Sequence, residues 1–514
     1  MRNLDPSIKE LITSGAKTLK DLASCKRRFA KKHQAPFPNN IALLKTYHEL
    51  VKSKSIKPSA LIETLLRTRP VRSLSGIVNI SVLTKPYKCP GKCLYCPTEK
   101  GIPKSYVSGE PAVERAKRLK YDPYLQVKKR IEMLESEGHP TDKIELRVVG
   151  GTWSFYPQKY QAWFVKRCFD ACNNGHAMSF KTSHVQNEKA RYRIVGLSVE
   201  TRPDFITPSE IKRLRKLGVT MVELGVQSIY DDILKKNLRG HGVKETISAT
   251  KLLKDAGFKV LYQMMPNLYG SSSARDLKMF KTLFTDSRFQ PDLLKIYPCA
   301  LLKSAPLFHV WRKGGYRPYA EKQLISLVRA IKKTVPYYVR IQRIARDIPS
   351  KSIAAGPAKI SNLRQLVGGH CKCIRCREVK GNYDPKEKLY LFRQNYQASS
   401  GQEIFLSFEN KNRSKLYSLL RFRITSQNTA IIREIHTYGQ LQPIAQDQDV
   451  GGFASNISPQ HKGLGKKLIA EAEKISRREF KVKKIAVISG VGARRYYRKL
   501  EYKLEKTYMV KNLG

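Results

Sequence analysis

The segment Lys88-Cys89-Pro90-Gly91-Lys92-Cys93-Leu94-Tyr95-Cys96 places three cysteines on one short loop, in the pattern CxxxCxxC. It follows a β-branched run at residues 77–82 that is typical of a strand. Cysteine thiolates hold iron–sulfur clusters, and the usual number is four. Three thiolates can hold three irons of a 4Fe-4S cluster and leave the fourth iron open to a small molecule. The alternative is a structural zinc loop whose fourth ligand lies elsewhere.

The chain around this loop alternates between strand-like and helix-like patterns. Further β-branched runs lie near residues 144–149, 194–199, 219–226, 259–263, 293–297 and 339–344. Helical patterns separate most of them, for example at residues 123–137, 209–217, 244–256 and 321–334. Repeated βα units predict an α/β domain over residues 76–348, with a parallel sheet that is open or closed into a partial barrel. In such folds ligands bind at the carboxyl ends of the strands.

Glycines and polar residues follow several of these runs, on the expected ligand side. The candidates are Gly150, Gly151, Thr152, Glu200, Arg202 and Gln227. Glycines let a backbone approach a ligand closely, and the charged groups suit contacts to ribose and carboxylate. With Tyr95 in the cysteine loop, this arrangement resembles the radical S-adenosylmethionine superfamily, in which the glycine-rich segment receives the methionine amino group of the cofactor. Each of these residues taken singly could serve a structural role instead.

A loop-rich connector at residues 349–388 carries a second cysteine triplet. Cys371, Cys373 and Cys376 follow the pattern CxCxxC, and thiolates at this spacing suit tetrahedral zinc. His370 and the distant Cys299 are candidates for the fourth ligand. A second iron–sulfur cluster is the alternative.

Residues 389–514 change to a series of strands followed by a helix at 464–479 and a further strand at 484–489, which predicts an α+β domain. The helix opens with Gln460-His461-Lys462-Gly463-Leu464-Gly465. Backbone N–H groups at a helix N-terminus bind pyrophosphate well, and glycines permit its approach. This loop resembles the coenzyme A (CoA) loop of the GNAT acetyltransferases. Tyr496 and Tyr497 lie beyond it, and the alternative for them is a place in the core.

The charge balance points to a polyanionic partner. Lys and Arg number 97 against 42 Asp and Glu, giving a formal net charge of +55. Nucleic acid is the expected partner, with a merely solvated basic surface as the alternative. Residues 1–75 are basic and mostly helical in pattern, and form either a positive arm for RNA or a packing extension. Neither a membrane span nor a signal peptide is visible, so we expect a cytoplasmic protein.

Ten segments in collinear order resemble the Elongator protein 3 family, the catalytic subunit of Elongator, from about residue 70 onward. They are EPAVERAKRLKYDPYLQ, GGTWSFYPQKY, VGLSVETRPD, GVQSIYDDILKKNLRGH, DAGFKVLYQMMP, LLKIYP, RDIP, IREIHTYG, HKGLGKKLIAEAEKI and ISGVGARRYYRKL. The resemblance implies a radical S-adenosylmethionine partial barrel joined through a zinc connector to a GNAT-like domain. It implies an enzyme that makes 5-carboxymethyluridine at the wobble position of tRNA, using acetyl-CoA and S-adenosylmethionine. It also assigns a catalytic role to Lys295 of LLKIYP, and assigns acetyl-CoA positioning to Tyr496 and Tyr497.

The chain departs from the family pattern at three places. Thr98-Glu99 replace a common Gly-Gly pair, Glu501 replaces a common glycine, and the short first cysteine spacing favours a prokaryotic type. Two competing functions follow from the same sequence. One is a protein lysine acetyltransferase with a structural iron–sulfur domain, which would not need all three cysteines of the first triplet. The other is a non-catalytic RNA-binding scaffold, which would not need the glycines of the CoA loop. The electron donor is not indicated, and a homodimer remains an open alternative.

Overall fold

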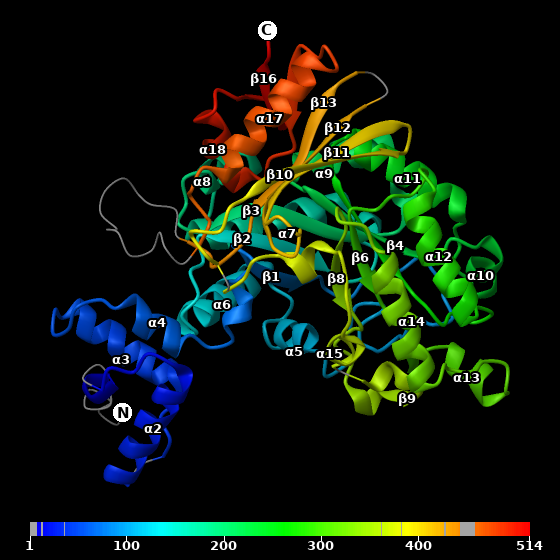
Figure 1. Ribbon diagram of the computed structural model, residues 1–514. Coiled ribbons are helices and arrows are strands. Elements are labelled where there is room, and N and C mark those ends of the chain that lie inside the picture. Colours follow the sequence, from blue (N-terminus) through cyan, green and yellow to red (C-terminus); the bar gives the residue numbers. More distant parts are fainter. Residues whose placement is uncertain are drawn as a thin grey trace.

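The computed structural model describes residues 8–11, 14–34, 36–360, 362–381, 383–425, 428–442 and 458–514. Within these ranges the chain forms two seven-stranded sheets and one two-stranded sheet. In Figure 1 a group of N-terminal helices projects to one side of the body that the two large sheets form. The predicted domain limits at residues 75, 348 and 388 fall between elements and stay predictions.

The N-terminal helices build a small core of their own. They are α2 (Leu19–Lys32), α3 (Asn40–Lys52) and α4 (Ala60–Leu66). Leu22, Leu43, Tyr47 and Leu66 belong to one buried cluster that these helices share. Lys31 and Lys32 of α2 are exposed to solvent, whereas Lys26 of the same helix is buried.

The first large sheet is parallel throughout, with the order β1-β2-β3-β4-β5-β6-β8. Its strands are β1 (Val78–Leu83), β2 (Lys143–Val149), β3 (Arg193–Thr201), β4 (Met221–Gln227), β5 (Lys259–Met264), β6 (Leu293–Ile296) and β8 (Arg340–Ile344). Every β-branched run expected from the sequence overlaps one of these strands. The predicted parallel α/β sheet is therefore confirmed.

Helices follow most of the strands and cover the outside of this sheet. They are α5 (Pro111–Arg118), α6 (Pro123–Ser136), α7 (Gln158–Asn173), α8 (Phe180–Asn187), α9 (Pro208–Lys216), α10 (Asp231–Lys236), α11 (Val243–Asp255), α12 (Ser273–Thr285), α13 (Leu307–Arg312) and α14 (Glu321–Thr334). In α14, Leu324, Leu327, Val328 and Ile331 recur with helical spacing and are buried in the main core. Such a stripe binds a helix to a sheet by burying apolar surface.

The sheet is curled into an open half-barrel. Its edges are β1 and β8, which are not neighbours in the strand order. Even so, Arg147 of β2 and Gln342 of β8 line the same cavity, so strands near opposite edges face one another across the concave side. The right-handed twist between neighbouring strands accumulates into this curvature.

A connector leads from the half-barrel to the second large sheet. It contains β9 (Ile353–Ala355), which pairs antiparallel with β7 (Leu301–Leu302), and then α15 (Leu363–Val367) and α16 (Ile374–Arg377). Short 3₁₀ turns are η1 (Pro70–Arg72), η2 (Trp153–Phe155), η3 (Pro203–Phe205), η4 (Ser350–Ser352), η5 (Pro357–Lys359) and η7 (Val491–Ala493).

The second large sheet has the order β10-β11-β12-β13-β14-β16-β15. Its strands are β10 (Tyr390–Ala398), β11 (Gly401–Glu409), β12 (Leu416–Ile424), β13 (Ala430–Thr437), β14 (Lys484–Val487), β15 (Lys503–Glu505) and β16 (Tyr508–Asn512). All neighbours are antiparallel except β13 and β14, which flank α17 (Leu464–Arg478) in sequence. With α18 (Arg494–Arg498), this is the additional α+β sheet domain that the sequence predicts.

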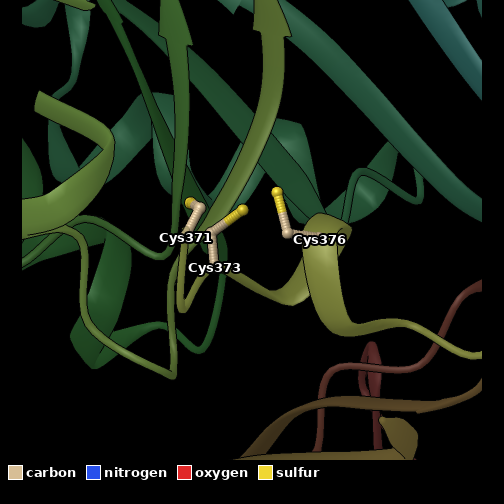
Figure 2. Close-up of side chains that lie close together, drawn as sticks. All are labelled: Cys371, Cys373 and Cys376. Carbon is tan, nitrogen blue, oxygen red and sulfur yellow. The ribbon is translucent and has the colours of Figure 1, made fainter. Parts of the chain in front are cut away.

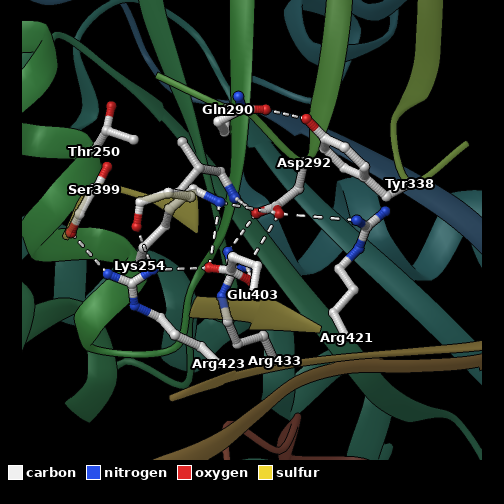
Figure 3. A network of polar contacts seen from close by, with 12 residues as sticks. Thr250, Lys254, Gln290, Asp292, Tyr338, Ser399, Glu403, Arg421, Arg423 and Arg433 are labelled. Atoms are coloured by element: carbon white, nitrogen blue, oxygen red, sulfur yellow. Dashed lines mark hydrogen bonds and ion pairs between the residues drawn. The ribbon is translucent and has the colours of Figure 1, made fainter. Parts of the chain in front are cut away.

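Buried ion pairs join the two large sheets (Figure 3). Asp292, just before β6, pairs with Lys254 of α11 at 3.3 Å and with Arg433 of β13. Glu403 of β11 pairs with Arg433 at 2.6 Å and with Arg423 of β12 at 3.1 Å. Because buried charges are costly unless paired, this network favours one relative placement of the two sheets.

Two glycines bring the second sheet's loops against β3. A Cβ at Gly490 would lie 2.1 Å from the carbonyl oxygen of Val195, and a Cβ at Gly492 would lie 2.6 Å from Cβ of Arg193. No real Cβ makes such contacts. The glycines of the segment ISGVG therefore have a packing reason in this fold.

Candidate active site

Backbone hydrogen bonds fix the first cysteine loop beyond the carboxyl end of β1. Leu94 N–H donates to the carbonyl of Asn237 at 3.1 Å, and the Leu94 carbonyl accepts from Leu307 N–H at 2.8 Å. Thr98 N–H donates to the carbonyl of Ser304 at 3.1 Å. The loop is thereby tied to segments that follow β4 and β6, on the side of the sheet where ligands are expected.

Gly91 lets the side chain of Arg202 approach the thiols of this loop. A Cβ there would lie 3.4 Å from Sγ of Cys93, 3.8 Å from Sγ of Cys89 and 2.6 Å from Nη1 of Arg202. That same Nη1 is buried and has no hydrogen-bond partner among the described residues, while Nε and Nη2 of Arg202 bind Asp204 at 2.9 and 2.8 Å. Two thiols of this loop and a buried cationic donor without a hydrogen bond thus approach one point, which fits the predicted cluster and its anionic ligand.

Other polar groups approach the same thiols. Nη1 of Arg239 lies 3.5 Å from Sγ of Cys93, and Oγ1 of Thr152 lies 3.8 Å from Sγ of Cys89. Arg239, at the end of the segment GVQSIYDDILKKNLRGH, was not among the predicted site residues.

The glycine-rich segment after β2 has two distinct roles. Gly150 has φ +120°, and a Cβ there would lie 2.3 Å from Oγ1 of Thr84, so packing alone requires a glycine. Gly151 has φ +61°, and the nearest atom to its Cβ position is Oη of Tyr156 at 3.9 Å. Gly151 therefore leaves space open beside Thr152, whereas Gly150 does not.

A cavity of about 330 Å³ opens beside Cys96. We call it the cysteine-side cavity. Among its lining residues are Tyr95, Cys96, Tyr106, Glu110, Arg115, Arg147, Glu200, Gln227, Gln263, Lys295, Tyr297, Gln342, Arg343 and Arg346. Gln227, with the left-handed φ of +69°, and Glu200 are the predicted cofactor-binding residues that reach it.

Lys295 lies on β6 between two carboxylates at the base of this cavity. Its ammonium donates to Oε1 of Glu200 at 3.1 Å and to Glu223. Burial alone would lower the pKa of Lys295, but Glu223, Tyr297 and Glu200 outweigh it and raise the pKa well above its ordinary value. Lys295 is therefore a fixed cation here, suited to hold charge and donate hydrogen bonds.

Several further groups in the cavity were not singled out from the sequence. Oη of Tyr106 donates to Oε2 of Glu200 at 3.0 Å, and Nε2 of Gln263 donates to Oε1 at 2.9 Å. Arg346 binds Glu110 at 3.1 Å and lies over the ring of Tyr106. Glu110, Gln263 and Arg346 all lie in segments that carry the family resemblance. That resemblance was the one feature of the sequence that could have identified them as site residues.

The CoA-type loop begins α17 with a left-handed residue. Gly463 has φ +78° and stands at the N-cap of α17, and the space around its Cβ position is open. A Cβ at Gly465 would lie 2.9 Å from Oη of Tyr496, which is 36% exposed. The structure thus brings Tyr496 to the loop. Tyr497 is only 4% exposed and packs in the core of the second sheet, with burial raising its pKa.

The first residues of this loop make contacts to the half-barrel. The side-chain amide of Gln460 donates to the carbonyls of Gly76 and Thr437 at 3.1 and 2.9 Å, and it accepts from Nζ of Lys143 at 2.9 Å. His461 also contacts Lys143, at 3.1 Å, and Lys462 lies over the ring of Tyr383. In this structure the side chain of Gln460 therefore links the half-barrel to the second sheet by hydrogen bonds.

The second triplet forms a compact group. The sulfur atoms of Cys371, Cys373 and Cys376 all lie within 4.8 Å of one another, and Figure 2 shows them gathered at one point of the connector. Three thiols this close can bind a single ion. Neither His370 nor Cys299 joins the group, and within the described residues no fourth His, Cys, Asp or Glu does so. The structure leaves the fourth ligand unassigned.

Within the described residues, no helix combines the length and the apolar character needed to cross a membrane. The half-barrel and its three-cysteine loop define the class of the protein. Residues 84–278 match the Radical SAM superfamily, and residues 291–372 match the Radical_SAM C-terminal domain.

Comparison with whole proteins narrows this class. A tRNA uridine(34) acetyltransferase of Methanocaldococcus infernus is 44% identical, covering 90% of this chain and 91% of that protein. Elongator complex protein 3 of Danio rerio is 38% identical, covering 87% and 86%. The structure of the archaeal Methanocaldococcus infernus Elp3 with an N-terminal deletion matches with a TM-score of 0.75 at 42% identity, covering 85% of this chain and 100% of that chain. This chain therefore belongs to the family of tRNA uridine(34) acetyltransferases and Elongator complex protein 3.

Proposed function

We propose that this protein adds a carboxymethyl group, derived from acetyl-CoA by radical S-adenosylmethionine chemistry, to carbon 5 of the wobble uridine in tRNA. One observation carries the proposal: a three-cysteine loop beside a charged cavity and a CoA-type glycine loop stand in one chain whose relatives are named tRNA uridine(34) acetyltransferases. Neither an acetyltransferase alone nor a radical enzyme alone needs both. The protein lysine acetyltransferase alternative finds no support in the relatives' names.

The cysteine side would hold the radical cofactor. Cys89, Cys93 and Cys96 would bind the 4Fe-4S cluster, and the groups available to S-adenosylmethionine are Gly151, Thr152, Glu200, Arg202 and Gln227, with Gly150 shaping the turn. When bound, these cofactors supply the chemistry that removes a hydrogen atom from the acetyl methyl group. The unpartnered Nη1 of Arg202 is the donor best placed for a carboxylate.

Lys295 would act in this reaction as a charge. Its raised pKa keeps the ammonium protonated at neutral pH, so it cannot accept a proton there. It would instead hold Glu200 in place and present hydrogen bonds toward the cavity. A preorganised cation of this kind stabilises negative charge that develops on a reacting group.

The second sheet would hold acetyl-CoA. The backbone N–H groups that follow Gly463, at Leu464 and Gly465, would bind the pyrophosphate at the start of α17. Tyr496 would orient the thioester, because its hydroxyl reaches the loop at Gly465. The buried Tyr497 would support Tyr496, whose ring it meets at a centroid distance of 5.3 Å.

The remaining parts of the proposal concern partners and metals. The net charge of +55 and the exposed lysines of α2 support tRNA as the substrate in a cytoplasmic protein. Cys371, Cys373 and Cys376 would bind zinc and stabilise the connector. The reaction also needs an electron donor, whose identity stays open, and a homodimer is the first oligomeric state to test.

Nucleoside analysis tests the function directly. The anaerobically reconstituted protein is incubated with tRNA, S-adenosylmethionine, acetyl-CoA and a chemical reductant, and the nucleosides are identified by mass spectrometry. We expect 5-carboxymethyluridine only in the complete mixture. Acetylated protein that forms without S-adenosylmethionine, with unchanged uridine, would favour the lysine acetyltransferase instead.

A further inference from the structure

A second cavity, of about 270 Å³, lies on the concave side of the half-barrel. We call it the arginine-rich cavity. Six cations line it, namely Arg72, Arg130, Arg147, Arg340, Arg375 and Lys380, against the single acid Glu378. Elements from three parts of the chain contribute these groups: the segment before β1, the half-barrel, and the connector with the second cysteine triplet.

The two cavities lie in line along the strands. On β1, Asn79 lines the arginine-rich cavity, and Ser81, two residues further on the same face, lines the cysteine-side cavity. On β8, Arg340 lines only the former, whereas Gln342 lines both. Arg147 of β2 also lines both. Arg147 and Gln342 thus form the boundary between a cavity near the amino ends of the strands and one near their carboxyl ends.

Two residues that line the arginine-rich cavity carry side-chain oxygens without hydrogen-bond partners. Oε1 of Gln342 is buried with no hydrogen bond among the described residues, and the residue as a whole is only 8% exposed. Oδ1 of Asn79 is likewise buried and has no hydrogen bond among the described residues. A buried carbonyl oxygen without a hydrogen bond is costly, so two of them on residues that line this cavity indicate that a hydrogen-bonding ligand belongs there.

The positive charges of the cavity are only partly neutralised. Arg340 pairs with Glu378, and Arg72 pairs with Glu137. Arg130 has no ion pair in the described part of the chain. Burial, with Arg72 and Arg115 nearby, lowers the pKa of Arg130 to about 10. An anion in this cavity would therefore relieve repulsion that the protein alone leaves in place.

We propose that the arginine-rich cavity receives the target nucleotide of the RNA substrate. Arg130 and Arg375 bind its phosphate, and the amides of Asn79 and Gln342 hydrogen-bond the edge of its base. A side-chain amide offers a donor and an acceptor, which match the adjacent carbonyl and N–H of uracil. The base then reaches the cysteine-side cavity at the Arg147–Gln342 boundary. This proposal rests on the proposed function.

The geometry explains how a loop base could meet the radical site. Sequence-specific RNA recognition commonly uses unpaired loop bases that are turned outward and bound on their hydrogen-bonding edges. Enzymes that modify a base place it in a pocket, and the cost of turning it out is least when it is already single-stranded. Entry from the amino ends of the strands leaves the carboxyl ends to the cysteine loop.

Photo-crosslinking with the full-length protein tests the location without any cofactor. An anticodon stem-loop carrying 4-thiouridine at the wobble position is bound and irradiated, and the crosslinked peptide is identified by mass spectrometry. We expect crosslinks to the strands that carry Asn79, Arg147 or Gln342. Crosslinks confined to the second sheet or to the N-terminal helices would overturn the proposal.

Binding measurements test the individual residues. Wild type should bind a stem-loop with wobble uridine about tenfold tighter than one with an abasic site there, and Asn79→Ala with Gln342→Ala should remove that difference. Arg130→Ala should weaken both RNAs alike and reduce the salt slope by about one, whereas the exposed control Arg478→Ala should leave the uridine preference intact. A uridine preference that survives the double amide change overturns the subsite. Wild type that makes no modified uridine in the complete mixture counts instead against the function.

Discussion

The two cysteine triplets use the same side chain at nearly the same spacing, in surroundings of opposite character. The sulfur atoms of Cys371, Cys373 and Cys376 lie within 4.8 Å of one another, and none of the three lines either cavity. Among the described residues the first triplet forms no such group, and the thiols of Cys89 and Cys93 lie close to Gly91 and to the guanidinium group of Arg202. Cys96 also faces the cysteine-side cavity.

This difference separates a site that joins elements from a site that admits ligands. The second triplet is flanked by backbone bonds from Ile374 N–H to the carbonyl of Val339 and from Val379 N–H to that of Leu416, each 2.9 Å. Those bonds link the half-barrel and the second sheet. A structural metal ion at the second triplet would contribute folding energy, whereas a cluster at the first triplet would keep a position open for chemistry. The following predictions test this distinction, from the largest effect to the smallest.

The largest effect is expected at the first triplet. Cys96→Ala removes one of three cluster thiols, so iron content, S-adenosylmethionine cleavage and uridine modification should all be lost. Zinc content and thermal stability should stay near wild type, because the side chain faces a cavity. Metal analysis, cleavage assays and melting curves on one preparation check this. Normal cleavage by the variant would contradict the radical assignment.

A change in the CoA-type loop should also stop modification while leaving both metal sites intact. Gly463→Glu places a carboxylate where pyrophosphate is expected, and forces a side chain into the left-handed φ of +78°. Acetyl-CoA binding, measured by calorimetry, should fall below detection. Gly463→Ala is the matched control, because it brings the same backbone strain without the charge and should retain part of the binding.

Lys295 gives a graded test of the cavity. Lys295→Met removes the cation that lies between Glu200 and Glu223 and should reduce the modification rate by roughly 10²-fold or more. It should also destabilise the fold by about 3–5 kcal/mol, because buried carboxylates lose their partner. Lys295→Arg keeps the charge and should recover the stability. Because the pKa of Lys295 is raised, the wild-type rate should show no titration of this group near neutral pH.

The second triplet should respond in the opposite way to the first. Cys373 is fully buried, so Cys373→Ala should release the expected zinc and lower the melting temperature by several degrees or more. Iron bound per folded molecule should stay near wild type. Loss of both iron and zinc from a variant that remains folded would mean that the two sites are coupled. The contrast between the two triplets predicts instead that they bind metal independently.

The sequence predicted some parts of this picture well because their signals are local. Buried parallel strands are rich in β-branched residues, so runs such as 144–149 and 259–263 mark β2 and β5 within a residue or two. The cysteine and glycine motifs are likewise contiguous. The short, largely polar β15 carries no comparable pattern and was not predicted.

Long-range properties were outside the reach of the sequence. Whether Gly150 serves a ligand or packing depends on Thr84, which lies 66 residues earlier in the chain. The charge state of Lys295 depends on carboxylates from two other strands. Gln460 was predicted to contact CoA. In the structure its side-chain oxygen accepts a hydrogen bond from Lys143, and its side-chain nitrogen donates one to the carbonyl of Gly76. The arginine-rich cavity needs the curl of the sheet before its residues meet.

The smallest predicted effect concerns acid stability of the contact between the sheets. Glu434 of β13 pairs with Lys259 of β5 at 3.2 Å and with Arg421 of β12 at 2.7 Å. Burial alone would raise the pKa of Glu434, but Lys259 and Arg421 outweigh it and lower the pKa to about 2. The unfolded carboxyl keeps its ordinary value of 4.5.

A depressed carboxyl pKa stabilises the folded state fully above the unfolded value. This stabilisation, about 3 kcal/mol for Glu434, is lost as the pH falls from about 4.5 toward 2. Other carboxylates titrate in acid too, so wild type alone cannot report on Glu434. The free energy of unfolding of Glu434→Gln, measured against wild type at pH 7 and at pH 3, isolates the group. The gap between the two proteins should shrink as the pH falls, and a gap independent of pH would show that the carboxylate of Glu434 contributes no pH-linked stability to the contact between the sheets.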